Sequence, residues 1–143
     1  MIDLFSKKLI KMAPKFRSLT VLDARDSLTE KMNFLRAFSD RYLVLNFKVD
    51  TALGQAAGFV LTEKLPVLMA KASGFLNAIE IIQSILCEPN LNVKLVGVGD
   101  EQVVEIMRTI PGLKVMVPST EEEVGKAVEA MLAHYGPTYL HLI

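Results

Sequence analysis

Charged side chains follow several apolar runs of this sequence, in places where carboxylates and amines can bind ligands or move protons. They are Asp23, Lys48, Asp50, Lys71 and Asp100, with Gly99 and Ser119 beside them. If the apolar runs are parallel strands, their carboxyl ends meet at one edge, which is where open α/β sheets bind ligands. We therefore predict a candidate cleft at this edge; the alternative is a rim of charged loops in solvent.

Two motifs near these residues point toward known chemistries but complete neither. Gly97-Val98-Gly99 follows a strand-like run, as in a dinucleotide-binding fingerprint, but Gln102 stands where the third glycine belongs. Asp23, Asp26 and Lys71 are residue types of a phosphoacceptor site, but no aspartate ends the third apolar run, which leads into Lys71. The sequence therefore argues against NAD binding and against a phosphoacceptor role.

The histidines and the cysteine form no recognisable reactive group. His134 falls in the last turn of an expected helix and His141 in the last expected strand, and neither lies beside a nucleophile motif. Cys87 is the only cysteine, so no internal disulfide can form. We expect structural roles for all three residues and no bound metal. A cytoplasmic location is the default expectation for such a chain.

Two kinds of element alternate along the chain and would position the charged rim. Short apolar or β-branched runs indicate strands at 19–22, 42–47, 66–70, 93–98, 113–117 and 139–143. Helical patterns occupy about 27–38, 50–63, 75–87, 100–110 and 121–134, after a basic amphipathic helix within 2–17. Ser27 with Glu30, and Thr120 with Glu123, have capping-box spacing. We predict an α/β fold: a three-layer α/β/α domain with a six-stranded, mainly parallel sheet.

Two of these elements carry further expectations. The run at 42–47 is continuously apolar, which indicates a strand buried on both faces. The helix at 50–63 is apolar almost all round, which indicates deep burial. Gly54 and Gly58, four residues apart on this helix, permit close approach of another backbone. That backbone would belong either to the chain's own sheet or to a symmetry mate.

Size and charge limit the classes of function. The 143 residues fit one domain, 1–143, and 51% of them are hydrophobic. Sixteen basic residues balance sixteen acidic ones, which argues against a nucleic-acid partner and permits self-association. No apolar run reaches the ~18 residues that a membrane-spanning helix needs. The basic segment 2–17 has the pattern of a membrane-surface helix or transit peptide, but we expect it to pack on the domain with its lysines in water.

Several segments, in order, resemble the pyrimidine-binding (central) domain of the transketolase family. Arg41–Gly58 is similar to an arginine, a strand, a GIAEQ-type motif and an AAG helix of that family. Residues 86–97, LCEPNLNVKLVG, resemble its PNLNVK-type strand, and 106–118 resembles its IP-x-L segment that ends in proline. Residues 136–140, GPTYL, resemble its GP-x-Y-L close. The resemblance covers essentially the whole chain and implies the thiamine-diphosphate-binding fold.

The resemblance implies thiamine diphosphate chemistry, in which enzymes of the family move two-carbon units between sugar phosphates. There, a glutamate of this domain holds the aminopyrimidine in its reactive tautomer, and the cofactor lies between two domains, usually across a dimer interface. Counting back from Ala56-Ala57-Gly58, that glutamate falls on Val49, which cannot relay a proton. Asp50 is one position away and one methylene shorter, and a misplacement of about 1 Å lowers a rate about a hundredfold.

Three further features of the family are absent. Residues 70–74, AKASG, stand where the family packs phenylalanines on the pyrimidine ring, and Phe75 is the only ring nearby. The 143 residues also lack the histidine-bearing loop after the fourth strand and the diphosphate- and metal-binding domain. We assign no catalytic residue. The candidate cleft consists of Asp23, Lys48, Val49, Asp50, Lys71 and Asp100.

Two functions of different classes are consistent with this pattern. The first is a non-catalytic transketolase-like domain, without cofactor, that acts as a binding, scaffold or regulatory module. The alternative is one subunit of a split transketolase that depends on thiamine diphosphate and magnesium. A separate diphosphate-binding chain would complete it, and Asp50 would act for the missing glutamate. We expect a homodimer, because the family pairs this domain and Gly54 and Gly58 permit close approach, and we expect neither a nucleic-acid nor a membrane partner.

Overall fold

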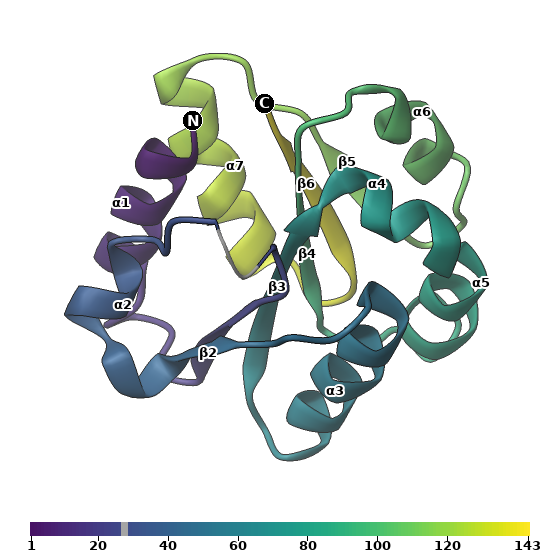
Figure 1. Ribbon diagram of the computed structural model, residues 1–143, viewed down its shortest axis with the longest axis horizontal. Coiled ribbons are helices and arrows are strands. Elements are labelled where there is room, and N and C mark those ends of the chain that lie inside the picture. The colour runs from purple at the N-terminus through teal and green to yellow at the C-terminus, as the bar shows by residue number, and fades with distance from the viewer. Residues whose placement is uncertain (27–28) are drawn as a thin grey trace.

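The computed structural model describes residues 1–26 and 29–143. Its centre is a six-stranded sheet with the strand order β2-β1-β3-β4-β6-β5, and every pairing is parallel (Figure 1). The strands are β1 (Leu19–Asp23), β2 (Tyr42–Val44), β3 (Leu65–Lys71), β4 (Lys94–Val98), β5 (Lys114–Met116) and β6 (Thr138–Leu142). This arrangement confirms the predicted α/β class and the six-stranded parallel sheet.

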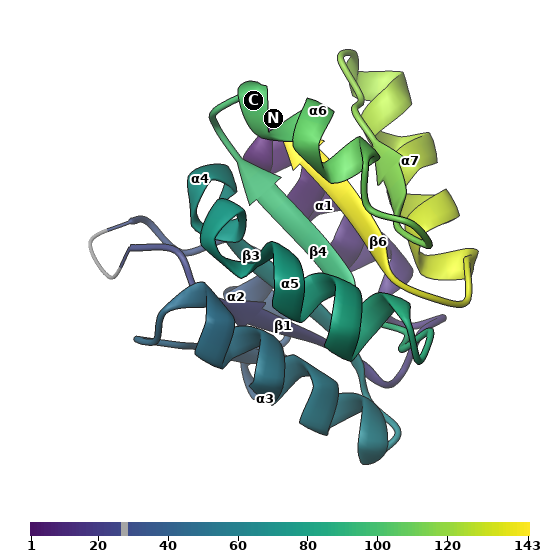
Figure 2. The ribbon, with the colours of Figure 1, turned by 90° about the vertical axis from the view of Figure 1, so that its right-hand side faces the viewer.

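Helices cover both faces of the sheet, so the domain has three layers (Figures 1 and 2). One face carries α1 (Ile2–Met12), α2 (Phe34–Ala37) and α7 (Glu121–Ala133). The other carries α3 (Val49–Leu61), α4 (Ala72–Phe75), α5 (Ile79–Ile81) and α6 (Gln102–Arg108), with the π-helical turn η3 (Ile82–Cys87). Short 3-10 turns lie at Ser39–Arg41 (η1) and Leu76–Ala78 (η2). None of the helices in the described part of the chain is long and apolar enough to cross a membrane.

Two hydrophobic clusters, one on each face of the sheet, form the core. Val21 of β1 packs with α1 and α7, whereas its neighbour Leu22 packs with α3 and η3. Successive side chains of a strand point to opposite faces, so a strand buried on both faces is mostly apolar along its whole length. Each fully buried aliphatic side chain of this kind stabilises the fold by roughly 1.5–3 kcal/mol. The continuous apolar runs of β1, β3 and β4 therefore indicated the layered fold correctly.

Gly97 of β4 is required by packing. Tyr139 of β6 is fully buried, and its ring meets that of Phe75 edge-on with centroids 5.7 Å apart. A methyl group at Gly97 would collide with the Tyr139 hydroxyl. The first glycine of the incomplete dinucleotide motif thus makes room for a neighbouring ring, which gives it a structural role.

The second predicted helix is much shorter than expected. It was placed from about Ser27, which lies outside the described residues, but α2 begins only at Phe34. In a helix, the Glu30 carbonyl would accept a hydrogen bond from the Phe34 N–H. Here the Glu30 carbonyl accepts from Arg25 Nη2 at 3.1 Å, and the Phe34 N–H donates to Ser6 Oγ at 3.1 Å. Contacts with residues elsewhere in the fold thus occupy the backbone groups that a longer helix needs.

Two burial predictions are wrong. β2 ends at Val44 and lies at the edge of the sheet, so Leu43 and Val44 are 41% and 42% exposed. In α3, Gly54 and Gly58 face solvent and Leu61 is 79% exposed. Apolar composition does not reveal that a strand has a single neighbour, or that a helix of small residues packs through one side only.

The remaining helices vary in how well their patterns predicted them. The segment expected as one helix at 75–87 consists of α4, η2, α5 and η3, with a break at Ala78, where φ is −125° and ψ is 18°. The capping box at α7 is confirmed, because Thr120 Oγ1 accepts from the Glu123 N–H at 3.1 Å. A helix that carries its own cap was therefore located more accurately than one whose boundaries depend on distant contacts.

Candidate functional site

A cleft of about 660 Å³ opens beyond the carboxyl ends of β1 and β3, beside the first residues of α3 and α4. It is lined by Ala24, Asp26, Phe47, Lys48, Val49, Asp50, Lys71, Ser73, Gly74, Asn77 and Ala78. Four residues of the predicted candidate cleft, Lys48, Val49, Asp50 and Lys71, are among these. They meet because β3 ends at Lys71 and α3 begins at Val49 at the same edge of the sheet.

Asp23 does not line this cleft. Its side chain is 1% exposed and accepts hydrogen bonds from Arg25 Nε and Nη2, each at 2.9 Å, and from the Tyr42 hydroxyl. Burial alone would raise the pKa of the Asp23 carboxyl, but the hydrogen bonds from Arg25 and Tyr42 outweigh burial and hold that pKa below its usual value. Burial and the bond to Asp23 raise the pKa of Tyr42 to about 12. Asp23 is therefore an ionised structural group that joins β1, β2 and the segment around Glu30.

Asp100 also lies apart from the cleft. It follows β4, and its Oδ1 accepts from the Gln102 N–H at 3.1 Å, at the start of α6. His141, on neighbouring β6, is fully buried and its Nδ1 lies 2.9 Å from the Tyr139 hydroxyl. Burial lowers the pKa of His141. Asp100 and His141, at this end of the sheet, thus each have a hydrogen-bond partner nearby in the chain.

Val49 forms part of the cleft wall. It is the first residue of α3 and packs against the core on that face of the sheet. A methyl group at Gly74 would lie 2.7 Å from Val49 Cγ2, so the absence of a side chain at Gly74 leaves room for the valine. The position that the family resemblance assigns to a proton-relaying glutamate is therefore filled by a packed apolar side chain.

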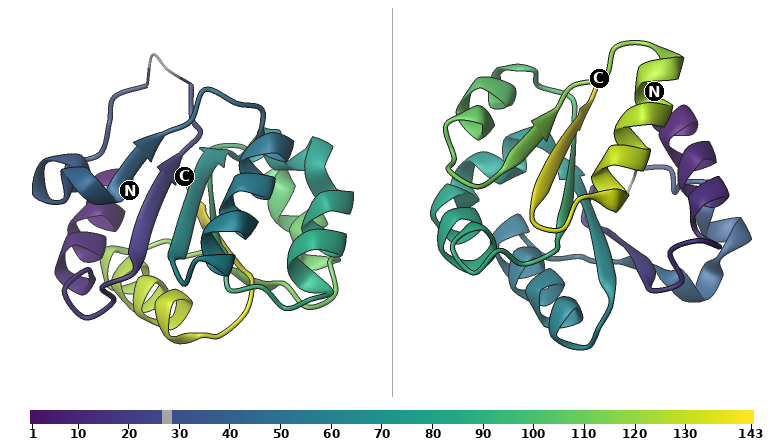
Figure 3. Two further views of the ribbon diagram at one scale, coloured as in Figure 1. Left: turned by 90° about the horizontal axis from the view of Figure 1, so that it is seen from below. Right: turned by 180° about the vertical axis from the view of Figure 1, so that it is seen from behind.

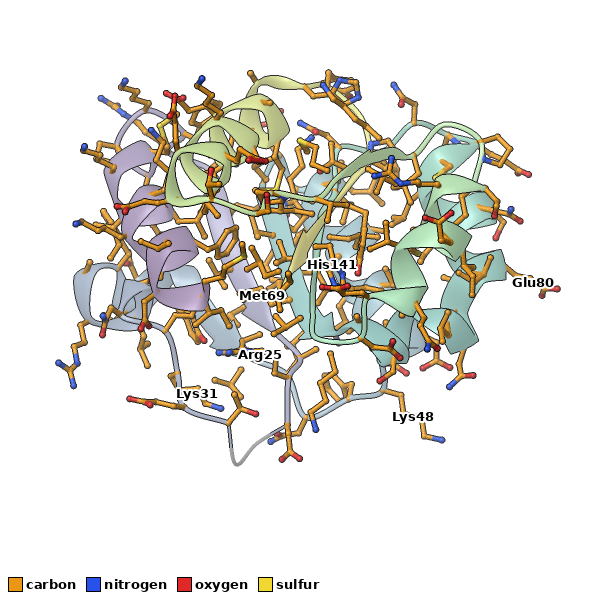
Figure 4. The ribbon with its side chains drawn as sticks, turned by 90° about the horizontal axis from the view of Figure 1, so that it is seen from above. Arg25, Lys31, Lys48, Met69, Glu80 and His141 are labelled. Atoms are coloured by element: carbon orange, nitrogen blue, oxygen red, sulfur yellow. The ribbon has the colours of Figure 1, made fainter. Side chains whose placement is uncertain are left out.

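The charged residues of the cleft are mostly solvated. Asp50 is exposed, and its Oδ1 accepts from the Thr51 N–H at 2.8 Å. Lys71 Nζ lies 3.6 Å from Asp26 Oδ2, with 63% and 46% of the two side chains exposed. An ion pair this exposed contributes about 0–1 kcal/mol. Figure 4 shows Lys48 extending away from the body of the domain, whereas Arg25 and His141 lie inside it.

Phe47 is a cleft residue that the sequence interpretation missed. It was assigned to a strand buried on both faces, but β2 ends three residues earlier and Phe47 is 48% exposed. The nearby ring that was considered, Phe75, is fully buried against Tyr139 and faces the core. Phe47 directly precedes Lys48, and this adjacency to a predicted rim residue was the available signal.

The residues of the cleft do not fit the aminopyrimidine of thiamine diphosphate in its catalytic role. Activation of that ring requires a carboxyl group in direct contact with a ring nitrogen. Val49 offers no proton, and the Asp50 carboxylate is in solvent and bound to its neighbour's N–H. Within residues 1–26 and 29–143, no group of three or more His, Cys, Asp or Glu side chains could hold a metal ion. We therefore derive no catalytic step through this cofactor.

Comparison with known proteins finds similarity to proteins described as transketolases, the family that the sequence motifs resemble. No family model matches the chain. A protein described as "Putative transketolase C-terminal section", from Methanocaldococcus jannaschii, is 29% identical over an alignment that covers 96% of this chain and 48% of that protein. A 1-deoxy-D-xylulose-5-phosphate synthase from Desulfotalea psychrophila is 26% identical, over 94% of this chain and 23% of its own length. The chain thus spans about half of the first relative and a smaller part of the second.

Two solved structures share the fold. One is described as "Split gene transketolase, inactive beta4 tetramer"; its TM-score is 0.89 with 26% identity, over 98% of this chain and 49% of that one. The other, a "putative thiamin diphosphate-dependent enzyme" from Mycobacterium smegmatis, has a TM-score of 0.70 with 15% identity, over 96% of this chain and 30% of that one, and shows the fold alone. Together with the matching motifs, these likenesses lead to one conclusion: the chain is a transketolase-like α/β domain.

Proposed function

We propose that this chain is a domain of the pyrimidine-binding type that has lost transketolase catalysis and acts in the cytoplasm as a binding, scaffold or regulatory module. The observation that carries the proposal is Val49. It occupies the glutamate position of the resembling motif and packs toward Gly74. A packed valine can neither accept a proton nor swing into solvent, so the cleft keeps a binding shape without a proton relay.

Asp50 does not supply the missing group in this proposal. Its carboxylate points to solvent and is bound to the Thr51 N–H, whereas a relay needs a carboxyl group held against the ring. The cleft retains Lys48, Lys71 and the exposed ring of Phe47 as groups that can contact a ligand. Binding therefore remains possible where proton transfer does not.

Two measurements test this function. Calorimetric titration of the purified chain with thiamine diphosphate and magnesium is expected to show no saturable binding. The variant Val49→Glu, assayed with the same cofactor and sugar phosphates, is expected to give no transketolase turnover, because a single carboxylate does not replace the remaining cofactor contacts. Saturable binding by the wild type, or turnover by the variant, would overturn the proposal.

The alternative function is a subunit of a split thiamine-diphosphate-dependent transketolase. The descriptions of two similar proteins favour it. One is described as a transketolase C-terminal section, and the other as a split gene transketolase in the form of an inactive "beta4 tetramer". Both extend beyond the part that this chain matches. In this alternative a separate chain binds the diphosphate and magnesium, and Asp50 stands in for the glutamate.

Reconstitution separates the two functions. The chain is mixed with the diphosphate-binding subunit of a split transketolase, thiamine diphosphate, magnesium and sugar phosphates. Turnover that depends on both chains and falls in Asp50→Asn would establish the alternative. Stable association of the two chains without turnover would support a scaffold or regulatory role, and absence of both would eliminate the alternative.

We also infer that the chain forms a homodimer through α3. Gly54 and Gly58 face solvent there, and a methyl group at either position would meet no atom within 4 Å beyond its own chain neighbours and the adjacent backbone of α3. A glycine inside a helix is about 1 kcal/mol less favourable than alanine, and no packing contact among the described residues requires a glycine at these two positions. Sedimentation analysis should show a dimer that Gly54→Leu dissociates, while Gly125→Leu on α7 leaves it intact.

A further inference from the structure

The first helix carries an unpaired basic surface on the face of the domain opposite the α3 side. Residues 2–17 contain five basic side chains and one acidic side chain, in a chain whose formal net charge is zero. Lys7 and Lys11 of α1, and Lys15 and Arg17 just after it, are exposed and form no ion pair within the described residues. Lys8 alone is paired, with Glu129 of α7 at 3.3 Å.

Most of the apolar side of the same helix packs inside the domain. Phe5 and Leu9 are 0% exposed and Met12 is 8% exposed, and all three pack with α7 and α2. α1 and α7 lie side by side in Figures 1 and 3. A helix that binds a membrane surface inserts its apolar face into the lipid. The largest apolar side chains of this helix are buried in the domain, so they are not available to insert into a lipid surface.

A groove of about 430 Å³ runs between α1 and α7 and shares this surface. Its lining comprises Leu4, Lys7, Lys8, Ile10, Lys11, Glu121 and Gly125. Leu4 and Ile10 are the apolar part, and three lysines form the charged part. Gly125 keeps the α7 side open, because the nearest atoms to a methyl group there would be Lys8 Cδ and Cε at 4.0 Å.

We propose that this groove binds an acidic segment of a partner protein, with an apolar side chain of the segment between Leu4 and Ile10 and its carboxylates at Lys7 and Lys11. Lys7 and Lys11 are four residues apart on one side of the helix, where like charges repel. Bound carboxylates would relieve that repulsion. The apolar lining disfavours a nucleic acid, whose phosphates would gain nothing from Leu4.

Fluorescence anisotropy with two labelled peptides tests the proposal. One alternates glutamate with leucine, and its twin replaces each glutamate by lysine. The acidic peptide should bind the full chain and weaken as salt rises, whereas the basic twin should not bind. The variant Lys7→Glu/Lys11→Glu should weaken binding of the acidic peptide by about tenfold or more, because each contact changes from attraction to repulsion.

Gly125→Leu provides an independent test without any change in charge. It fills the groove and improves helix propensity, so the variant should fold and still lose binding by about tenfold. Lys64→Glu, an exposed charge reversal away from the groove, is the matched control and should bind as the wild type does. Failure of the acidic peptide to bind, or binding that both groove variants leave unchanged, would overturn the proposal. Equal or tighter binding of anionic lipid vesicles or single-stranded RNA through Lys7 and Lys11 would do so as well.

Discussion

Two groups of charges stand at the same edge of the sheet and differ in every physical respect. Asp23 and Arg25 are buried, linked by two side-chain bonds of 2.9 Å, and tied to Tyr42. Lys71 and Asp26, from neighbouring strand ends, are separated by 3.6 Å and largely solvated. The first group holds three segments of chain together, whereas the second lines an open cleft. Proximity to a strand's carboxyl end therefore does not identify a binding residue; the exposure of its polar atoms does.

Among these substitutions, Asp23→Ala is expected to have the largest effect on stability. The substitution leaves the Arg25 guanidinium buried without its carboxylate, and breaking a buried pair from one side costs about 3–5 kcal/mol. Urea unfolding should show a large fall in the denaturation midpoint. Lys48→Ala, on the exposed side of the comparison, should stay within about 0.5 kcal/mol of wild type. A similarly small effect of Asp23→Ala would show that the cluster is not structural.

Acid titration sharpens the same contrast. The pKa of Asp23 is lower in the folded chain than in the unfolded chain, so its contribution is fully present above the unfolded value and is lost as the pH falls through the folded one. The difference in unfolding free energy between wild type and Asp23→Asn should therefore shrink as the solution is acidified below about pH 4. A difference that stays constant with pH would mean that the carboxyl does not titrate differently on folding.

Gly74→Ala tests the packed wall of the cleft. Its methyl group would lie 2.7 Å from Val49 Cγ2, and such overpacking costs about 1–3 kcal/mol. The double variant Val49→Ala/Gly74→Ala should be less destabilised than the sum of the two single variants, because the shortened side chain makes room. Strict additivity in thermal unfolding would show that the two residues do not share the space.

The smallest effect is expected for the solvated pair. Lys71→Ala removes the ion pair with Asp26 but leaves no buried group without a partner, so the loss should be at most about 1 kcal/mol and should vanish at high salt. Thermal unfolding at low and high ionic strength measures it. A loss comparable to that of Asp23→Ala would place this pair with the structural charges.

Local patterns were sufficient for much of the fold. The strands β1, β3 and β4 are mostly apolar because both faces of a parallel sheet are covered, and that requirement is visible in the residues themselves. The cap at Thr120 needs only a residue three positions away, and it was located correctly. Lys48, Val49, Asp50 and Lys71 line one cleft because strand and helix boundaries place them at one edge of the sheet.

The errors share one cause, which is hydrogen bonding and strand pairing that no sequence pattern specifies, at separations along the chain from two to 28 residues. Asp23 lies outside the cleft in which it was predicted because it is hydrogen-bonded to Arg25 and Tyr42. The helix α2 is shorter than predicted because Arg25 and Ser6 form hydrogen bonds with backbone groups that a longer helix would use. Phe47 lines the cleft, and was not predicted to, because β2 is an edge strand that ends before residue 47. None of these contacts follows a spacing rule that can be recognised in a sequence.

The sequence by itself determined the α/β class, the parallel sheet, the likeness to transketolases and the valine where a glutamate is expected. Secondary structure and motifs depend on residue type and on short spacings along the chain, so both can be recognised directly from the sequence. Only the tertiary structure decided which charges are buried and which face solvent, and that the lysines of α1 share a groove with α7. Burial depends on which elements pack together, and packing joins residues far apart in the chain.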